Sequence, residues 1–522
     1  MHFSKSLPAI VPLSLASALP QASPTGSSAA AVSKTTCNGK TYVYRELAGY
    51  GFVPSNATDK FGDTIGGHGS AIAIDGASWL KIGNSYTGLL YTLPDRGWNT
   101  EGALNFQNRI HKFQLTFTPN ENATAANPSP PNLQLKYLDT ILLTDPRIQP
   151  TSGLDGAITG PYLNYPLIGE VPSANYTGDG FGGAGTGGNR AVIDSEGLVL
   201  GPGGTYFVSD EYGDYIYQFL PTGQMIRAIR PPPAFIPIRN GNESFSANSP
   251  PRYNPALAPT PGNPTSGRSN NQGLEGLTVN PAGTRLYALT QSALIQDGGT
   301  SNPTSRYARL LSYDITGLST RLVGEYVVPL NRVTSSATSN IARQSEIHYI
   351  SDTQFLVLAR DSGRGRGQGP SNTQSRYRDV DVFDISAATN IAGKSDCQTC
   401  SVAPGGVLNP NTTAATYCKW LDFNNNAQLN RYGVHNGGAE DAGLLNEKWE
   451  SMALVPVNKG ANGKAVNDEY YLLSLSDNDF ITQDGHLKMG QFNYADSSGY
   501  NLDNQALLFK VQLPSASSPL VG

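Results

Sequence analysis

Residues 271–297 read NQGLEGLTVNPAGTRLYALTQSALIQD and contain the pattern that decides the fold. An alternating strand starts at Glu275-Gly276, a tight turn follows at residues 280–283, and a second strand runs to Gln291. Two antiparallel strands joined by a tight turn bring the chain back to the same edge of the sheet. The acidic start of the first strand and the polar end of the second are therefore expected to meet at one edge.

The same pattern recurs four more times along the chain. The copies lie in residues 66–99, which end their second strand at Asp95-Arg96, and in residues 194–219, 345–365 and 448–480. An acidic residue starts the first strand in the last three copies, at Glu196, Glu346 and Glu450. Generic hairpins with similar turns are the alternative explanation. Radial repetition of such hairpins is typical of propeller blades, so the sequence predicts an all-β chain folded as a single β-propeller.

The composition agrees with strands and long loops. The 522 residues include 57 glycines and 36 prolines, and only 15% are charged, which argues against a helical bundle, a coiled coil or a disordered polyelectrolyte. Segments 119–131, 178–189, 230–271 and 362–375 are rich in Pro, Gly, Asn and Ser and are predicted to be loops on the propeller faces. The net charge of -5 argues against nucleic acid or an anionic membrane as a partner, and we expect a monomer.

The N-terminus predicts secretion. Lys5, an apolar run over residues 7–15 and small residues at 16–18 are typical of a signal peptide over residues 1–18, cleaved after Ala18 or as late as about residue 22. A short buried or anchoring helix is the alternative, and three prolines within the segment argue against it. The mature protein is expected to be extracellular and glycosylated at five N-x-S/T sites, Asn56, Asn122, Asn175, Asn242 and Asn411.

Four cysteines, at 37, 397, 400 and 418, allow two interpretations. Cys397-Gln-Thr-Cys400 could be a metal or redox pair, but zinc would want further ligands at suitable spacing and a redox C-x-x-C would want a βαβ context, and the sequence has neither. An even number of cysteines in a secreted chain favours two structural disulfides. Three pairings are open, and steric economy favours Cys37 with Cys397 or Cys400 and the remaining one with Cys418.

Several of these phrases resemble a known family. PDRGWN (94–99), DSEGL (194–198), SDEYGDYI (209–216), NQGLEGLTVNPAGTRLYAL (271–289), SEIHYI (345–350), LVLARD (356–361), KWESMAL (448–454) and SLSDNDF (474–480) are similar to successive blocks of the phytase-like family, also called esterase-like activity of phytase. The resemblance implies a β-propeller domain over residues 37–515 and hydrolysis of phosphoesters or other esters. Ser451 and Gln291 depart from the family pattern, which usually has glycine and an acidic residue there.

The repeats collect carboxylates that would crowd around one opening of the channel. Crowded carboxylates raise one another's pKa unless a cation lies among them, and hard oxygen ligands suit Ca²⁺ better than Mg²⁺ here. Alternatively, each acid only caps a turn or pairs with an arginine. The predicted calcium ligands are Glu196, Asp210, Glu275, Glu346, Glu450, Asp477 and Asp479.

Arginines supply the complementary charge. A planar guanidinium can hold a phosphate or carboxylate through two hydrogen bonds. We predict catalytic roles for Arg96, Glu211, Arg360 and Asp361, and substrate binding by Arg190 and Asp95. A Ser-His-Asp esterase is disfavoured, because the chain has six histidines and no G-x-S-x-G motif.

The sequence thus predicts a secreted, calcium-dependent hydrolase of small-molecule phosphate or related esters, with its site at the acidic, arginine-lined mouth of the channel. Two other classes of function are compatible with the same residues. One is a propeller that binds a ligand or partner without turnover, and the other is a propeller lactonase or sugar oxidoreductase.

Overall fold

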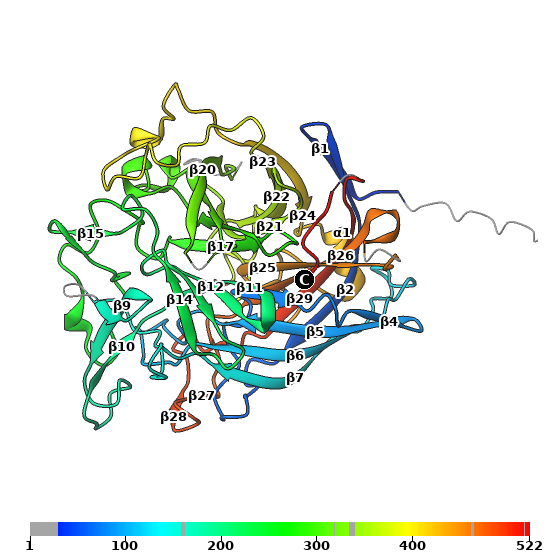
Figure 1. Cartoon of the computed structure of the whole chain (residues 1–522). Coiled ribbons are helices and arrows are strands. Elements are labelled where there is room, and N and C mark those ends of the chain that lie inside the picture. Colours follow the sequence, from blue (N-terminus) through cyan, green and yellow to red (C-terminus); the bar gives the residue numbers. More distant parts are fainter. Residues whose placement is uncertain (1–29, 158–161, 318, 334–339, 461–463, 516) are drawn as a thin grey trace, which may run out of the picture. The chain divides into compact units, whose positions relative to one another are not determined.

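Each of the five repeated phrases forms the first antiparallel strand pair of its own sheet in the computed structural model (Figure 1). The predicted all-β class is confirmed. The pairs are β3 (Ala71–Ile74) with β5 (Ser85–Leu93), β11 (Ser195–Leu200) with β12 (Tyr206–Asp210), β17 (Leu274–Val279) with β18 (Arg285–Thr290), β21 (Arg343–Tyr349) with β22 (Gln354–Arg360), and β25 (Lys448–Pro456) with β26 (Glu469–Asp477).

Further strands extend each sheet outward. The first gains β4 (Leu80–Ile82), β6 (Arg109–Phe117) and β7 (Leu133–Leu142), the second β13 (Ile216–Phe219) and β14 (Met225–Ile229), the third β19 (Tyr307–Asp314) and β20 (Arg321–Pro329), and the fourth β23 (Arg378–Asp384) and β24 (Thr416–Asp422). The fifth sheet combines segments that are far apart in the sequence. Its order is β1-β2-β29-β26-β25, with β1 (Ser33–Cys37), β2 (Lys40–Val53) and β29 (Asn504–Gln512).

The structure describes residues 30–157, 162–317, 319–333, 340–460, 464–515 and 517–522. The predicted signal peptide lies outside these residues. Residues 31–522 group into one unit, which contains the predicted domain over residues 37–515. None of the helices in the described part of the chain has the length and apolar character needed to span a lipid bilayer.

Shorter elements lie between the five sheets. Strands β8 (Tyr162–Tyr165), β9 (Gly169–Tyr176) and β10 (Gly188–Ala191) form a separate sheet, and two small hairpins are β15 (Ile238–Arg239) with β16 (Asn242–Glu243) and β27 (Gly485–Leu487) with β28 (Phe492–Tyr494). The described residues contain one α-helix, α1 (Asn426–Leu429). Short 3-10 turns lie at Pro202–Gly204, Pro255–Leu257, Ile295–Asp297, Asn302–Thr304, Pro404–Gly406, Asn430–Tyr432 and Val466–Asp468.

The first strands of the five sheets contact one another in cyclic order. β3 contacts β11, β11 contacts β17, β17 contacts β21, β21 contacts β25, and β25 contacts β3. The hydrophobic core lies largely between neighbouring sheets, where apolar residues of both sheets share one cluster. Val199 and Leu277 belong to one such cluster, and Leu289 and Ile347 to the next. The starts of the five first strands are thereby held close together.

Residues 518–522 bind to the edges of two of these first strands. The amide of Leu520 donates to the carbonyl of Tyr349 over 3.1 Å, and the amide of Gly522 donates to the carbonyl of Leu454 over 2.9 Å. Together with Glu346 and His348, this segment lines an apolar cavity.

The prediction of two disulfides is confirmed, but the favoured pairing is wrong. Cys37 pairs with Cys418, and Cys397 pairs with Cys400. The structure brings Cys37 to Cys418 because β1 contacts β24, and their Cα atoms are 5.8 Å apart. The tight turn at Cys397 places its Cα 5.0 Å from that of Cys400, within the usual range for a bridge.

Candidate functional site

Three glutamates occupy equivalent positions at the starts of first strands. In β11, Ser195 pairs with Asp210 and Gly197 with Ser209, so Glu196 has no partner of its own and forms a β-bulge. The same irregularity places Glu275 in a bulge of β17 and Glu450 in a bulge of β25. A bulge bends its strand and re-aims the extra side chain. The acidic residues at the starts of these three strands therefore share one structural feature, the β-bulge.

Glu346 does not share this position. In β21 the register shifts between Gln344 and Glu346, so Ser345 is the bulged residue. Glu346 instead occupies the place of a glycine or serine in the other sheets, and its carboxylate accepts hydrogen bonds from the amides of Leu277 and Ile347 at 3.1 and 2.7 Å. The expectation that Glu346 joins the acidic set is corrected, because one residue of register separates it from the bulge.

The turns beside these strands bring further carboxylates together. Asp95, Asp194 and Glu196 each place an oxygen within 4.8 Å of the others, and so do Asp95, Asp477 and Asp479. Asp95 belongs to both groups. Within the described part of the chain, no hydrogen bond reaches either carboxylate oxygen of Asp194, although the side chain is buried. We call these five residues the carboxylate cluster.

Positive side chains partly compensate the cluster. The Lys448 ammonium lies 2.7 Å from a carboxylate oxygen of Asp479 and 3.3 Å from one of Asp477. A guanidinium nitrogen of Arg96 lies 3.1 Å from a carboxylate oxygen of Asp194. The Lys448 ammonium therefore pairs with two carboxylates of the group Asp95, Asp477 and Asp479. In the group Asp95, Asp194 and Glu196, the Arg96 guanidinium pairs with Asp194.

Arg360, the last residue of β22, pairs with two glutamates near the start of β25. Its guanidinium lies 2.5 Å from a carboxylate oxygen of Glu450 and 3.3 Å from one of Glu447. Arg343 lies directly opposite Arg360 on the neighbouring strand, and the two like charges repel each other. Burial and Arg360 lower the pKa of Arg343, while Glu211 and Glu275 oppose that effect.

The carboxylates interact strongly with one another. Burial, followed by the charges of Glu275 and Asp194, raises the pKa of Glu196 well above its ordinary value. Burial and Asp477 do the same to the pKa of Asp95. Burial also raises the pKa of Glu211, to about 7. A bound cation would favour the ionised forms of these groups.

Glu211 combines an anchored oxygen with a second oxygen that has no partner. Its Oε1 accepts a hydrogen bond from the Gly273 amide over 2.9 Å. No described residue donates a hydrogen bond to its Oε2. This carboxylate is held in place, yet one oxygen remains able to accept or release a proton.

Three of the predicted site residues have other surroundings. Asp210 accepts hydrogen bonds from the amides of Asp194, Tyr212 and Gly213, so it ties the residue before β11 to the turn after β12. Asp361 accepts hydrogen bonds from the Ser375 hydroxyl and the Arg376 amide and organises a loop.

The third is Arg190, which lies on β10, outside the five repeated sheets. Its guanidinium is 5.6 Å from the ring centroid of Tyr176, and it lines a cavity together with Asp63 and Lys488. The structure does not bring Arg190 to the carboxylate cluster.

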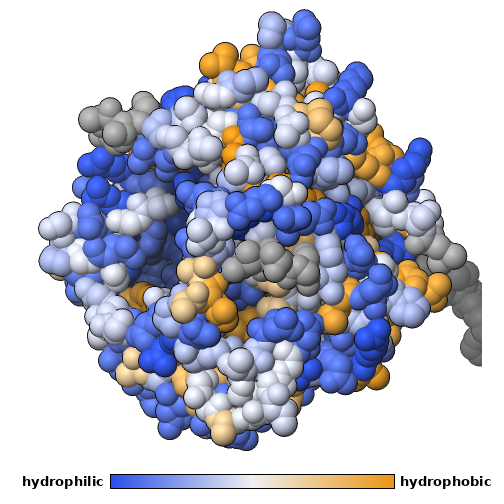
Figure 2. Space-filling view, turned by 90° about the vertical axis from the view of Figure 1, so that its left-hand side faces the viewer, coloured by the Kyte–Doolittle hydropathy of each residue, from blue (hydrophilic) through white to orange (hydrophobic). Residues whose placement is uncertain are grey.

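Sequence reasoning missed Asp194, Arg343 and Lys448, although a signal was present. Each lies two residues before the bulged residue of its strand. Side chains two apart on a strand point to the same side. In D-S-E, R-Q-S and K-W-E, the charged first residue therefore marks the side chain that lies on the same side of the strand as the bulged residue. Hydrophilic residues surround a hollow in the face seen in Figure 2.

Comparison with known proteins gives one close relative and distant structural similarities. A secreted protein of uncharacterised function from Arthroderma benhamiae is 49% identical over 468 residues, which are 87% of this chain and 90% of that protein. Among solved structures, a luciferin-regenerating enzyme matches with a TM-score of 0.27 and 11% identity over 88% of this chain and 95% of that one. An aldose sugar dehydrogenase from Streptomyces coelicolor matches with a TM-score of 0.23 and 11% identity over 91% of both chains. These TM-scores are too low to define the fold.

The profile of one protein family matches residues 72–480. The match covers four of the five repeated strand pairs completely and nearly all of the first. This chain therefore belongs to the phytase-like family, described as esterase-like activity of phytase.

Proposed function

We propose that this chain is a secreted hydrolase of phosphate or related esters, with its site at the carboxylate cluster and the arginines beside it. The family description supports ester hydrolysis. The predicted signal peptide supports secretion, and the Arthroderma benhamiae relative is itself named a secreted protein.

The five repeated sheets are proposed to form one five-bladed propeller. The cyclic contacts of β3, β11, β17, β21 and β25 support this arrangement, because each first strand then lies beside the central axis. In such a ring the bulged glutamates and the turns after β5 and β26 surround one end of the channel. The proposed site is that end.

Asp95, Asp194 and Glu196 are the proposed calcium ligands. Their oxygens lie within 4.8 Å of one another, and hard oxygen donors suit Ca²⁺. The observation that carries this assignment is Asp194, a buried carboxylate that lacks hydrogen-bond donors among the described residues. Arg96 pairs with Asp194 at 3.1 Å, and a bound calcium ion would give this buried, acceptor-only group a further partner. When bound, calcium would polarise an ester oxygen and acidify a water molecule.

The neighbouring side chains suit an anionic ester. Arg96 and Arg360 are positioned to hold an oxyanion of the substrate through their planar guanidinium groups. Arg96 is fixed by Asp194 and by a hydrogen bond to Asn271, and Arg360 by Glu450. Glu211 lies next to Asp194, since its amide donates to the Asp194 carbonyl over 3.0 Å, and its unpartnered oxygen could take a proton from attacking water.

Purified protein assayed on phosphomonoester, phosphodiester and carboxyl-ester substrates, with calcium and with a chelator, tests the proposal. We expect hydrolysis of at least one phosphate ester that the chelator abolishes and calcium restores. Asp194→Asn should lose the activity, whereas Glu346→Gln, which removes a buried carboxylate outside the cluster, should keep it. Absence of hydrolysis on every substrate, with intact calcium binding, would favour a ligand-binding propeller instead.

A further inference from the structure

The two disulfides of this chain lie in different environments. Cys37–Cys418 joins β1 to β24 across 381 residues of sequence, and Cys37 is fully buried while Cys418 is half-buried. Cys397–Cys400 joins residues three apart, on a loop where Cys397 is exposed and Cys400 is half-buried. Cys397 is thus the one exposed residue among the four cysteines, so we expect a reagent in solution to reach the second bridge more readily than the first.

The loop that carries Cys397–Cys400 is held by hydrogen bonds as well as by the bridge. The Cys400 amide donates a hydrogen bond to the Cys397 carbonyl over 2.9 Å, which already closes the turn. A bridge across so few residues also removes little entropy from the unfolded chain. Opening this disulfide should cost little stability, whereas Cys37–Cys418 closes a very long loop.

A buried arginine fixes the backbone on both sides of the bridge. Arg309 is fully buried and forms ion pairs with Asp297 at 2.7 Å and Glu325 at 2.9 Å. The same guanidinium donates to the backbone carbonyls of Ser395 and Cys400 at 3.0 and 2.9 Å. Because these acceptors are backbone atoms, the hydrogen bonds themselves involve neither sulfur, and we expect them to persist when the bridge opens.

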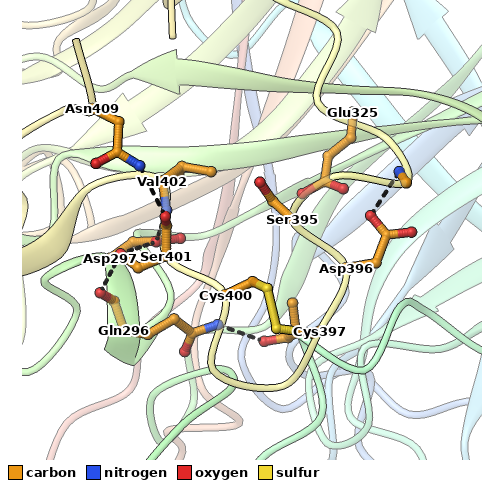
Figure 3. Close-up of a disulfide and its surroundings, with 12 residues drawn as sticks. Gln296, Asp297, Glu325, Ser395, Asp396, Cys397, Cys400, Ser401, Val402 and Asn409 are labelled. Atoms are coloured by element: carbon orange, nitrogen blue, oxygen red, sulfur yellow. Dashed lines mark hydrogen bonds between the residues drawn. A yellow bond between two sulfur atoms is a disulfide. The ribbon is translucent and has the colours of Figure 1, made fainter. Parts of the chain in front are cut away.

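Asp297 holds the segment after the bridge. Its carboxylate accepts hydrogen bonds from the Ser401 hydroxyl at 3.0 Å and from the Val402 amide at 2.8 Å, and Asn409 donates to the Ser401 carbonyl (Figure 3). These hydrogen bonds thus support the backbone around the two cysteines, of which Cys397 is exposed and Cys400 is half-buried.

We propose that Cys397–Cys400 is a reversible thiol–disulfide exchange site for an extracellular dithiol, separate from the proposed ester-hydrolysing site. A thiolate of the dithiol attacks the exposed Sγ of Cys397, the S–S bond breaks, and Cys400 Sγ leaves with the electron pair and takes up a proton. The second thiol of the partner then attacks the mixed disulfide and releases the Cys397 thiol. Two electrons and two protons pass to this chain, and the partner becomes a disulfide. The fixed support favours the reverse reaction with an oxidised partner.

Treatment of the folded, full-length chain with dithiothreitol, followed by alkylation and peptide mapping, tests the proposal. We expect label at Cys397 and Cys400 at least about tenfold faster than at Cys37 and Cys418, with an unchanged circular-dichroism spectrum. Removal of the reductant and addition of oxidised glutathione should restore the bridge. Labelling of all four cysteines together, labelling only after unfolding, or failure of the bridge to re-form would overturn the proposal.

Two single variants test which sulfur is attacked. Cys400→Ser leaves the exposed Cys397 thiol, which should take up one glutathione from oxidised glutathione, measured as a mass increase of the intact protein. Cys397→Ser leaves the half-buried Cys400, which should react at least about tenfold more slowly. Equal rates in the two variants would contradict the assignment of Cys397 as the attacked sulfur.

Discussion

Lys448 occupies in β25 the position that Asp194 occupies next to β11, two residues before a bulged glutamate. The same backbone position therefore delivers a cation on one side of the cluster and an anion on the other. The ammonium of Lys448 pairs with both Asp477 and Asp479 and compensates part of their charge, whereas Arg96 pairs with Asp194 from the other group. This asymmetry is why we place the proposed calcium ion beside Asp194 and not beside Lys448.

Asp194→Asn should weaken calcium binding at least about tenfold, because a neutral amide oxygen is a poorer ligand for a hard cation than a carboxylate. Calorimetric titration of calcium into the wild-type and variant proteins measures the change. Glu346→Gln is the matched control, since it removes a buried carboxylate that lies outside the cluster. Equal calcium affinity of wild type and Asp194→Asn would remove Asp194 from the proposed site.

Lys448→Met should make the protein more dependent on calcium. Loss of the ammonium leaves Asp477 and Asp479 without a counter-charge, so we expect the free energy of unfolding to fall by about 3 kcal/mol in chelator. Calcium should then raise the Tm of the variant more than that of the wild type, because the group Asp95, Asp477 and Asp479 becomes available to a cation.

Thermal unfolding with chelator and with calcium measures both effects. Lys419→Met is the control, since Lys419 pairs at 2.8 Å with the buried Asp379 away from the cluster. A calcium-induced Tm shift of Lys448→Met no larger than that of the wild type would show that Lys448 does not occupy a cation position.

Arg360→Lys should lower kcat/KM for an anionic ester at least about tenfold while calcium affinity stays unchanged. The charge is kept, but the planar fork that can hold two oxygens of one anion is lost. Initial-rate kinetics together with calcium titration separate the two effects. Arg321→Lys, at an arginine that is 75% exposed, controls for the substitution itself. A parallel loss of calcium affinity would assign Arg360 a structural role.

Asp381 should make the folded state less stable as the pH rises. Burial raises its pKa to about 6, although Tyr377, Tyr417 and the Trp420 amide donate hydrogen bonds to it and Lys419 lies nearby. Its contribution to stability is fully present below the ordinary aspartate pKa and is lost as the pH rises through about 6. The loss amounts to about 3 kcal/mol.

Denaturant unfolding of the wild type and of Asp381→Asn at pH 4 to 7.5, in chelator, measures this contribution. The variant should show a smaller fall in the free energy of unfolding over this range. Asp379 is also buried, and the charge of Asp381 helps to raise its pKa, so the difference between the two profiles reports the combined titration of this neighbouring pair. Identical pH profiles would contradict the assignment to Asp381.

The repeat, read from the sequence, located the five first strand pairs because alternating hydrophobicity and tight turns are local signals. The bulge at Ser345 could not be read, because the strand pairing that defines a bulge is not local, and Glu346 was placed one residue out of register for that reason. Asp210 looked like a ligand because only the folded turn reveals the three amides that occupy its oxygens. No local sequence pattern indicates that β1, β2 and β29 join one sheet. For this reason the pairing of Cys37 with Cys418 was not predicted.

The most direct test of the proposed site is a crystal structure of the protein grown with calcium, with an anomalous difference map calculated from the diffraction data. We predict a peak about 2.3–2.6 Å from carboxylate oxygens of Asp95, Asp194 and Glu196, and its loss in crystals of Asp194→Asn. A calcium ion bound elsewhere on the chain, with no peak beside Asp194 at saturating calcium, would contradict the assignment.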